Sequence, residues 1–497
     1  MSAQTDTAQR DVDVLIVGAG LSGIGAGCHL QTEAPGTTYA ILEGREASGG
    51  TWDLFRYPGV RSDSDMFTLG YRFKPWTSGP SIASGELILD YIRETAAEYG
   101  VEQHIRYRTS VTAASWSSET AQWTVTAQDV ESGEAQTWTC RFLYLCVGYY
   151  RYDEGYTPDW PGLADFAGQV VHPQHWPADF DATGKRVVVI GSGATAVTLV
   201  PALADSAAHV TMLQRSPSYL MPFPAKDPIA DALRKMLSPE LAYRLIRWKN
   251  VKLGIASYAY SRKQPAKVRK LLRNLAIKRL PEGYDVDKHF KPAYEPWDQR
   301  MCLSPDGDFY AAVRKGTADV VTDHIESFTA TGIRLRSGTE LPADVVVTAT
   351  GLNLQPMGGI ALVVDGEPVA VHERLTFKGM MLDGVPNLAF AMGYTNASWT
   401  LKVDLVSSYV ARMLTVMKQR GQSIVIAHRP TRQVRPTPFI EMTSGYFQRG
   451  VGLLPQQGDS SPWRLEQHYG KDSALFGGAV DDPALEFRTA AQPARTA

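Results

Sequence analysis

"VDVLIVGAGLSGIGAGCHL", residues 12–30, is the stretch that decides the fold of this chain. Its apolar run from Val12 to Val17 predicts a buried strand, and Gly18-x-Gly20-x-x-Gly23 follows at the start of a predicted helix. The first glycine permits a tight turn, the second lets backbone amides approach a pyrophosphate, and the third lets helix and strand pack closely. Because a helix N-terminus attracts phosphate, the stretch predicts a dinucleotide-binding cradle.

An acidic residue stands where such a cradle needs one. A second predicted strand, "TTYAILE", ends at Glu43, about twenty residues beyond the glycines. A carboxylate at this place can accept hydrogen bonds from the hydroxyl groups of a ribose. We therefore expect Glu43 to bind the nucleotide.

The pattern occurs a second time in "RVVVIGSGATAVTLVPALADSAAHVTMLQRS", residues 186–216. Here Gly191-x-Gly193-x-x-Ala196 separates a strand from a helix, and the next strand ends beside Arg215 rather than at an acid. A guanidinium group can bind a 2′-phosphate that a carboxylate would repel. This cradle is expected to prefer NADPH to NADH, unless Arg215 is an ordinary surface charge.

Two cradles with opposite charges predict FAD in the first and NADPH in the second, as in a flavin-dependent oxidoreductase. Two further apolar runs that end in glycine, "RFLYLCVG" (141–148) and "ADVVVTATG" (343–351), are expected to return to the flavin sheet.

The composition excludes several other classes. The chain has 497 residues, 44% of them hydrophobic, with 50 basic and 52 acidic side chains, so no net charge favours nucleic acid. The four cysteines have neither metal-ligand nor redox-dithiol spacing, so we expect reduced thiols and no metal site. Neither a signal peptide nor an apolar span of membrane length is indicated. The sequence therefore favours a cytoplasmic protein.

Two longer motifs indicate a family. "FAGQVVHPQHWP" (166–177) fits the signature F-x-G-x-x-x-H-x-x-x-W-P at Phe166, Gly168, His172, Trp176 and Pro177. "GGTWDLFRYPGVRSD" (49–63) fits a second signature in full. The chain resembles the class B flavoprotein monooxygenases of the type I Baeyer–Villiger group. The stretches "WDQRMCLSPDGD" and "GYTNASWTLKVDL" resemble the bacterial branch that includes the ethionamide-activating monooxygenase.

The resemblance implies a mechanism. NADPH would reduce the flavin, O2 would form a C4a-peroxyflavin, and one oxygen atom would be inserted next to a small apolar ketone's carbonyl to give an ester or lactone. Thioethers would give sulfoxides. The alternatives are a flavin-containing N- or S-monooxygenase without Baeyer–Villiger activity, or a non-catalytic protein that binds FAD and NADP.

The resemblance also assigns residues. It places the catalytic arginine at Arg300 in "WDQRMC", with Asp63 as its partner. The FAD contacts would include Gly50, Thr51, Trp52 and Asp53, and the segment 384–405 would bring Asn396 and Trp399 near the cofactor. Since Gln299 stands where several relatives have lysine, NADPH selectivity would depend on Arg215 and Ser216. His172 could be a general base, but its place between the cradles favours a structural role in an interdomain linker.

The expected fold is α/β, with two Rossmann-like dinucleotide-binding domains and a helical insertion. The FAD domain would be split between 1–150 and 353–497, and the NADPH domain between 151–216 and 301–352. The insertion, 217–300, suggests no strands, and Leu233, Leu237, Leu241 and Leu245 would share one helix face.

The insertion is strongly basic. From Lys226 to Lys291 the chain has seventeen basic and six acidic side chains. This imbalance indicates a solvated helical surface, or else a face that attracts NADPH or contacts an anionic membrane. The oligomeric state and the identity of the substrate are not indicated.

Overall fold

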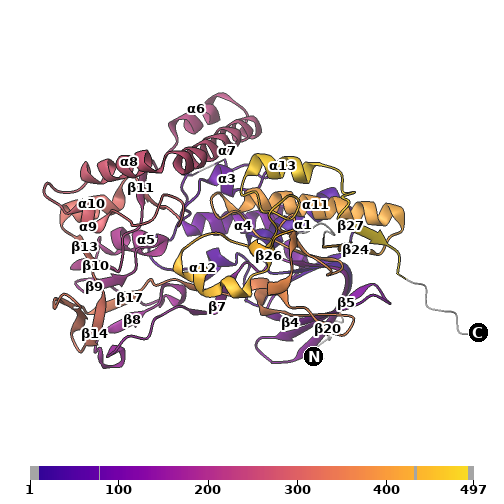
Figure 1. The fold of residues 1–497 in the computed structure, drawn as a ribbon, viewed down its shortest axis with the longest axis horizontal. Coiled ribbons are helices and arrows are strands. Elements are labelled where there is room, and N and C mark those ends of the chain that lie inside the picture. The colour runs from indigo at the N-terminus through magenta and orange to yellow at the C-terminus, as the bar shows by residue number, and fades with distance from the viewer. Residues whose placement is uncertain (1–9, 78, 430–433, 491–497) are drawn as a thin grey trace, which may run out of the picture.

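The structure is a computed structural model that describes residues 10–77, 79–429 and 434–490. Two sheets organise it, a large one that contains the first glycine cradle and a smaller one that contains the second (Figure 1). The α/β fold with two Rossmann-like units that the sequence predicts is therefore confirmed.

The first sheet has nine strands in the order β20-β19-β4-β5-β6-β1-β2-β3, with β23 paired to β6. Their bounds are β1 Asp11–Val17, β2 Tyr39–Leu42, β3 Ile105–Arg106, β4 Thr109–Ser117, β5 Gln122–Asp129, β6 Ala135–Leu145, β19 Ala361–Val364, β20 Glu367–Pro368 and β23 Leu388–Phe390. Strands β1, β2, β3, β6 and β23 run parallel, whereas β4, β5 and β6 form an antiparallel meander. The expected flavin-sheet strand within 141–148 is thus confirmed as the end of β6.

Strand β1 is buried on both faces, as its unbroken apolar run predicts. Ile16 belongs to a core on the side of the helices α1 (Leu21–Glu33), α4 (Gly85–Glu98) and α11 (Trp399–Arg420). Leu15 belongs to a second core that includes Trp116 and Trp123. The first glycine cradle is therefore held from both sides of the sheet.

The second sheet consists of five parallel strands in the order β13-β10-β9-β17-β8. Their bounds are β8 Gln169–Val171, β9 Arg186–Ile190, β10 His209–Gln214, β13 Ala318–Thr322 and β17 Val345–Thr348. The helices α5 (Ala194–Leu203) and α10 (Asp308–Lys315) pack on it, and an antiparallel meander adjoins it: β14 Ile325–Thr329, β15 Gly332–Leu335 and β16 Glu340–Pro342.

The prediction that 343–351 returns to the flavin sheet was wrong. This run forms β17, which pairs with β9 and β8 in the second sheet. The three valines Val345, Val346 and Val347 are fully buried there. An apolar run of this kind fits either parallel sheet, so its own pattern could not distinguish between them.

The chain crosses between the two sheets at one place. Strand β7 (Tyr150–Gly155) leads out of the flavin sheet and β18 (Leu352–Leu354) leads back, and the two pair antiparallel. The domain boundaries expected near residues 150 and 352 lie at these strands and stay a prediction.

Residues 217–300 are mainly helical but include one strand. Strand β11 (Leu220–Phe223) pairs with β12 (Cys302–Pro305), so the expectation of no strands was wrong. The helices are α6 Pro228–Met236, α7 Pro239–Lys263, α8 Pro265–Ile277 and α9 Val286–His289. Figure 1 shows α6 and α7 at the outer edge of the molecule.

The four leucines do not share one helix face, so that prediction was also wrong. Leu237 ends α6, and the side chain of Ser238 accepts a hydrogen bond from the backbone N–H of Leu241 to cap the N-terminus of α7. Leu233 packs against the core, whereas Leu241 and Leu245 are exposed. A serine followed by proline is the usual start of a new helix.

The C-terminal part returns to the first sheet and covers its helices. It contains α11, the short strand pairs β24 Ile424–Ala427 with β27 Leu485–Arg488 and β25 Thr437–Pro438 with β26 Gln456–Gln457, and the helices α12 Gly445–Gly450 and α13 Tyr469–Gly477. The predicted strand, glycine loop and helix of 384–405 are confirmed as β23 and the start of α11.

Candidate active site

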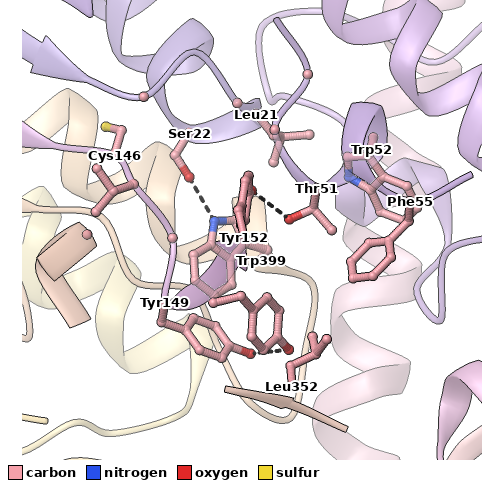
Figure 2. A pocket seen from close by; sticks show the side chains of 18 of the residues that line it. Leu21, Ser22, Thr51, Trp52, Phe55, Cys146, Tyr149, Tyr152, Leu352 and Trp399 are labelled. Carbon is pink, nitrogen blue, oxygen red and sulfur yellow. Dashed lines mark hydrogen bonds between the residues drawn. The ribbon is translucent and has the colours of Figure 1, made fainter. Parts of the chain in front are cut away.

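A cavity of about 450 Å³ lies where the two cradles approach each other. Its wall includes the first glycine loop, helix α2 (Thr51–Leu54), the start of β7, the N-terminal half of α5 and Arg300. Figure 2 shows Ser22, Thr51 and Tyr152 among the side chains that surround the cavity. One cavity thus contacts both predicted nucleotide sites.

The first cradle has the backbone that its glycines predict. Gly18 has φ +99°, and a Cβ atom there would lie 2.7 Å from the carbonyl oxygen of Cys146. A Cβ atom at Gly23 would lie 1.8 Å from the carbonyl oxygen of Gly18, so only glycine lets α1 start this close to β1. Gly18 and Gly20 line the cavity, and Gly23 holds the helix against the turn.

Glu43 lies at the end of β2 and lines the same cavity. Its two carboxylate oxygens accept hydrogen bonds from the backbone N–H groups of Ala19, at 2.7 Å, and Arg45, at 2.9 Å. Burial raises the pKa of Glu43, and these two hydrogen bonds oppose the rise. The carboxylate therefore fixes the glycine loop, and the expected contact with a ribose remains a prediction.

The signature of residues 49–63 forms a loop around α2. Gly50, Thr51 and Trp52 line the cavity, and the hydroxyl oxygen of Thr51 lies 3.2 Å from that of Tyr152 (Figure 2). The prediction that these three residues contact a cofactor is thus consistent with their positions.

Asp53 differs from its neighbours because it lies outside the cavity wall. Its buried carboxylate accepts hydrogen bonds from three guanidinium groups, those of Arg45 at 2.6 Å, Arg56 at 2.6 Å and Arg93 at 2.9 Å. With its oxygens occupied in this way, Asp53 stabilises the loop, and the structure does not support a direct cofactor contact.

Arg300 and Asp63 meet at the cavity. Arg300 lies just before β12 and Asp63 in the loop after α2, and the Arg300 Nε atom is 3.3 Å from Asp63 Oδ2. About a third of each side chain is exposed, 36% for Arg300 and 31% for Asp63. Asp63 raises the pKa of Arg300 above its usual value, and burial opposes this. The cavity therefore contains a permanent cation held by a carboxylate.

Aromatic side chains form the wall beside Arg300. Trp399 stacks on Tyr149 with ring centroids 5.5 Å apart, and its indole N–H donates a hydrogen bond to the Ser22 hydroxyl at 2.8 Å. The hydroxyl groups of Tyr149 and Tyr150 lie 2.9 Å apart (Figure 2). Burial raises the pKa of Tyr149, and Arg300 opposes the rise.

Sequence reasoning missed these tyrosines and placed Asn396 near the cofactor with Trp399. The side-chain amide of Asn396 instead donates a hydrogen bond to the carbonyl oxygen of Gln467 at 2.9 Å, outside the cavity wall. The available signal for the tyrosines was the aromatic run "YYRY" (149–152), which follows directly after the glycine that ends a flavin-sheet strand.

The second cradle has the same geometry as the first. Gly191 has φ +130°, and Gly193 is the N-terminal cap of α5. Ala196 is buried in the core of the second sheet. Nearby Thr195 and Thr198 line the cavity, which Gly191 and Gly193 do not.

Arg215 and Ser216 are exposed directly after β10. The Ser192 hydroxyl of the glycine loop donates a hydrogen bond to the Ser216 carbonyl oxygen at 3.1 Å, which ties the two segments together. Arg215 has no carboxylate partner within the described part of the chain. Its guanidinium group is therefore available to an anion, as the 2′-phosphate prediction requires.

The motif of residues 166–177 packs at the edge of the second sheet. Phe166 is packed against Phe328, β8 within the motif is an edge strand of the second sheet, and Trp176 packs against Phe180. Gly168 approaches the carbonyl oxygen of Asp344 so closely that a Cβ atom would be 2.5 Å away. The Pro177 carbonyl oxygen accepts a hydrogen bond from the Phe180 N–H.

His172 contacts the crossing strand rather than the cavity. Its ring lies so close to Gly155, the last residue of β7, that a Cβ atom there would be 1.9 Å from it. Its Nδ1 atom accepts a hydrogen bond from the Gln174 backbone N–H, and Gln174 in turn donates to the carbonyl oxygens of Arg151 and Tyr152. Burial lowers the pKa of His172. This geometry supports the linker role over the general base.

Comparisons with known proteins agree with these features. Residues 74–255 match the family model of flavin-binding monooxygenase-like proteins. The chain is 55% identical to the FAD-containing monooxygenase EthA of Mycobacterium tuberculosis over 96% of this chain and 97% of that protein. The chain belongs to the FAD-containing monooxygenases. This monooxygenase is also 49% identical to the putative FAD-containing monooxygenase MymA of the same organism, over 97% and 98% of the two chains.

Solved structures share the monooxygenase's fold. The oxidized steroid monooxygenase bound to NADP superposes with a TM-score of 0.76 at 21% identity, over 96% of this chain and 100% of that one. An open cyclohexanone monooxygenase gives 0.75 at 19% identity, over 97% and 100%. The arrangement of two nucleotide-binding units is therefore that of these monooxygenases.

Proposed function

We propose that this monooxygenase inserts one oxygen atom of O2 next to the carbonyl of a small apolar ketone, giving an ester or lactone, and that it also converts thioethers to sulfoxides. FAD and NADP(H) are its cofactors. The observation that carries the proposal is one cavity lined by the first glycine loop and by the start of α5, the helix of the second cradle, with the Arg300–Asp63 pair in its wall. The Baeyer–Villiger signature of residues 166–177 supports it.

The two cofactors fit the two cradles. FAD would lie along the first glycine loop and α2, whose residues Gly18, Gly20 and Thr51 line the cavity. The second loop and Arg215 would hold NADPH, with the guanidinium group on its 2′-phosphate. When bound and reduced, the flavin supplies the activation of O2.

The protein's own contribution is a fixed positive charge beside that chemistry. Arg300 stays protonated because Asp63 raises its pKa further, so it can stabilise negative charge that develops on oxygen in the cavity. The stacked rings of Tyr149 and Trp399 form an apolar part of the same wall, and an electrostatic interaction is stronger beside apolar groups than in bulk water.

The acids that line the cavity have other partners. Glu43 binds two backbone N–H groups and Asp63 binds Arg300, so neither is free to protonate a substrate. A reaction that depends on a fixed cation rather than on a proton donor agrees with this arrangement. Neither the oxygenation of a ketone nor that of a thioether requires a carboxylic acid to protonate the substrate.

Arg300→Ala tests the proposal. We expect this variant to bind FAD and to be reduced by NADPH, but to lose at least 100-fold in oxygenated product, in line with the loss of one charge-stabilising donor. Product is measured by mass spectrometry with a mixed panel of ketones and thioethers. Arg141→Ala, at a side chain that is 71% exposed, is the matched control and should retain full activity.

Two outcomes would contradict the proposal. Normal ester or sulfoxide formation by Arg300→Ala would remove the catalytic role of that residue. If the wild-type protein consumed NADPH at one rate with every ketone and thioether and released only hydrogen peroxide, the non-catalytic alternative would be favoured. Sulfoxide or N-oxide formation without any ester would instead favour the flavin-containing N- or S-monooxygenase.

A further inference from the structure

The outer face of α6 and α7 is apolar and exposed. We call it the α6–α7 patch, and it consists of Ile229, Met236, Leu241, Leu245 and Trp248. Met236 is 79% exposed and Trp248 is 63% exposed, which is unusual for such large apolar side chains. None of these residues belongs to the cavity described above.

The patch is a regular helix face. Leu241, Leu245 and Trp248 follow one another at spacings of four and three residues on α7, so their side chains project from the same side. The opposite side of α7 is buried through Ala242, Tyr243, Ile246 and Arg247.

A buried arginine fixes the orientation of α7. The Arg247 guanidinium group donates hydrogen bonds to the carbonyl oxygens of Phe67, at 2.8 Å, and Gly70, at 2.7 Å, next to α3 (Met66–Leu69). The Tyr243 hydroxyl also donates to the carbonyl oxygen of Tyr71 at 2.8 Å. Because these contacts hold the other side of α7, the side with Leu241, Leu245 and Trp248 is exposed to solvent. Figure 1 shows the helix itself at the edge of the molecule.

Basic side chains surround the patch. Lys235, Arg244, Lys252 and Lys263 are exposed on α6 and α7, and none of them has a carboxylate partner within the described residues. The acids on the two helices are Asp231, which faces Arg234 at 3.8 Å, and Glu240. The surface is therefore both apolar and positively charged.

These properties fit an anionic lipid surface. A helix that lies in a membrane interface has leucine and tryptophan on the buried side and lysine and arginine at the headgroup phosphates. A symmetric contact between two copies would instead place one basic surface against another, and Asp231 and Glu240 are too few to neutralise it. No helix within the described residues is long and apolar enough to cross a membrane.

We propose that the α6–α7 patch docks this protein on an anionic membrane surface, with Leu241, Leu245 and Trp248 among the headgroups and the surrounding lysines and arginine on lipid phosphates. The contact is peripheral and reversible, because it combines a small apolar area with charges that salt screens.

Vesicle flotation tests the proposal with the full-length, FAD-loaded protein. Vesicles of equimolar phosphatidylcholine and phosphatidylglycerol are compared with vesicles of phosphatidylcholine alone, at low and high salt. The wild-type protein should float with the anionic vesicles at low salt, and not with the neutral ones. The double variant Leu245→Glu/Trp248→Glu should lose more than tenfold in apparent affinity.

Two further variants separate the contributions. Lys235→Gln/Lys252→Gln should weaken binding by about 25-fold, since each basic residue near such a surface contributes about fivefold. Val130→Glu, at an exposed valine in the β5–β6 turn, is the matched control and should bind as the wild type does. Unchanged FAD content and unchanged NADPH oxidation without vesicles show that all variants are folded.

Three results would overturn the proposal. The first is a wild-type protein that stays with neither kind of vesicle at low salt. The second is equal binding to neutral and anionic vesicles that the lysine variants do not change. The third is a wild-type oligomer that Leu245→Glu/Trp248→Glu converts to monomers, which would assign the patch to self-association.

Discussion

His29 on α1 is expected to carry a positive charge that contributes to stability at neutral pH. Its ring is 2% exposed and each nitrogen faces a carboxylate oxygen, Nδ1 that of Glu33 at 2.9 Å and Nε2 that of Asp404 at 3.4 Å. A neutral imidazole could donate to only one of them, so the geometry requires the imidazolium form. Burial would lower the pKa of His29, but the hydrogen bonds to Asp404 and Glu33 outweigh it and raise the pKa to about 9.

The size and sign of the effect follow from this pKa. The unfolded chain loses the proton near pH 6.5 and the folded one near pH 9, so the folded state binds one more proton between them. The stabilisation is complete below pH 6.5 and is lost as the pH rises through 9, with a slope of about 1.4 kcal/mol per pH unit. The total is about 3 kcal/mol, less any interaction that the unfolded chain retains.

The assay compares His29→Gln with the wild type by urea unfolding at several pH values from 6 to 9. The stability difference between the two proteins should be largest at the acid end and should shrink toward pH 9. His324→Gln, at an exposed histidine, serves as the control for replacing a histidine with glutamine at the surface. A wild-type to His29→Gln difference that does not change with pH would refute the charged ring.

Three other perturbations address the cradles and the linker. Arg215→Ala should raise the KM for NADPH at least tenfold and leave the KM for NADH nearly unchanged, because only NADPH has the 2′-phosphate; equal effects in steady-state assays would remove this role. Asp53→Asn should lower the free energy of unfolding by about 2–4 kcal/mol, because it breaks a buried ionic cluster, and an unchanged unfolding midpoint would contradict this. Gly155→Ala should cost about 1–3 kcal/mol, because its Cβ atom would collide with the His172 ring. The control is Gly254→Ala, where a Cβ atom meets nothing within 4 Å. Thermal unfolding should show a lower midpoint for Gly155→Ala than for the wild type, and no lower midpoint for Gly254→Ala. Equal midpoints for the two glycine variants would argue against the close contact between Gly155 and His172.

The parts of the fold that sequence predicted correctly are those in which neighbours along the chain decide the structure. The order of strand, glycines and helix around Gly18 and Gly191 is a local pattern, and it was sufficient to predict each cradle. The start of α7 was missed although Ser238 and Pro239 give a local signal for it, because the leucine spacing was continued through the break.

Other features depend on residues far apart in the chain. The valines of β17 fit either sheet, and only pairing with β9 decides between them. The charged cluster around His29 depends on Asp404, which lies 375 residues away. Asp53 lies in the signature of residues 49–63, but its carboxylate binds Arg93, which is 40 residues further along the chain. The Arg300–Asp63 pair was predicted from the family resemblance, because residue spacing alone could not distinguish Arg300 from the other arginines.

The pairing of β7 with β18 has a practical consequence for protein engineering. Because the chain leaves the first sheet and re-enters it at adjacent strands, the whole NADPH-binding half can be exchanged between homologues with only two junctions. Such a chimaera must also preserve the hydrogen bonds between the two halves, among them those of Arg247, which travels with the transplanted half while its acceptors, Phe67 and Gly70, stay behind. Donor and recipient should therefore be matched at this arginine before they are matched at any nucleotide contact.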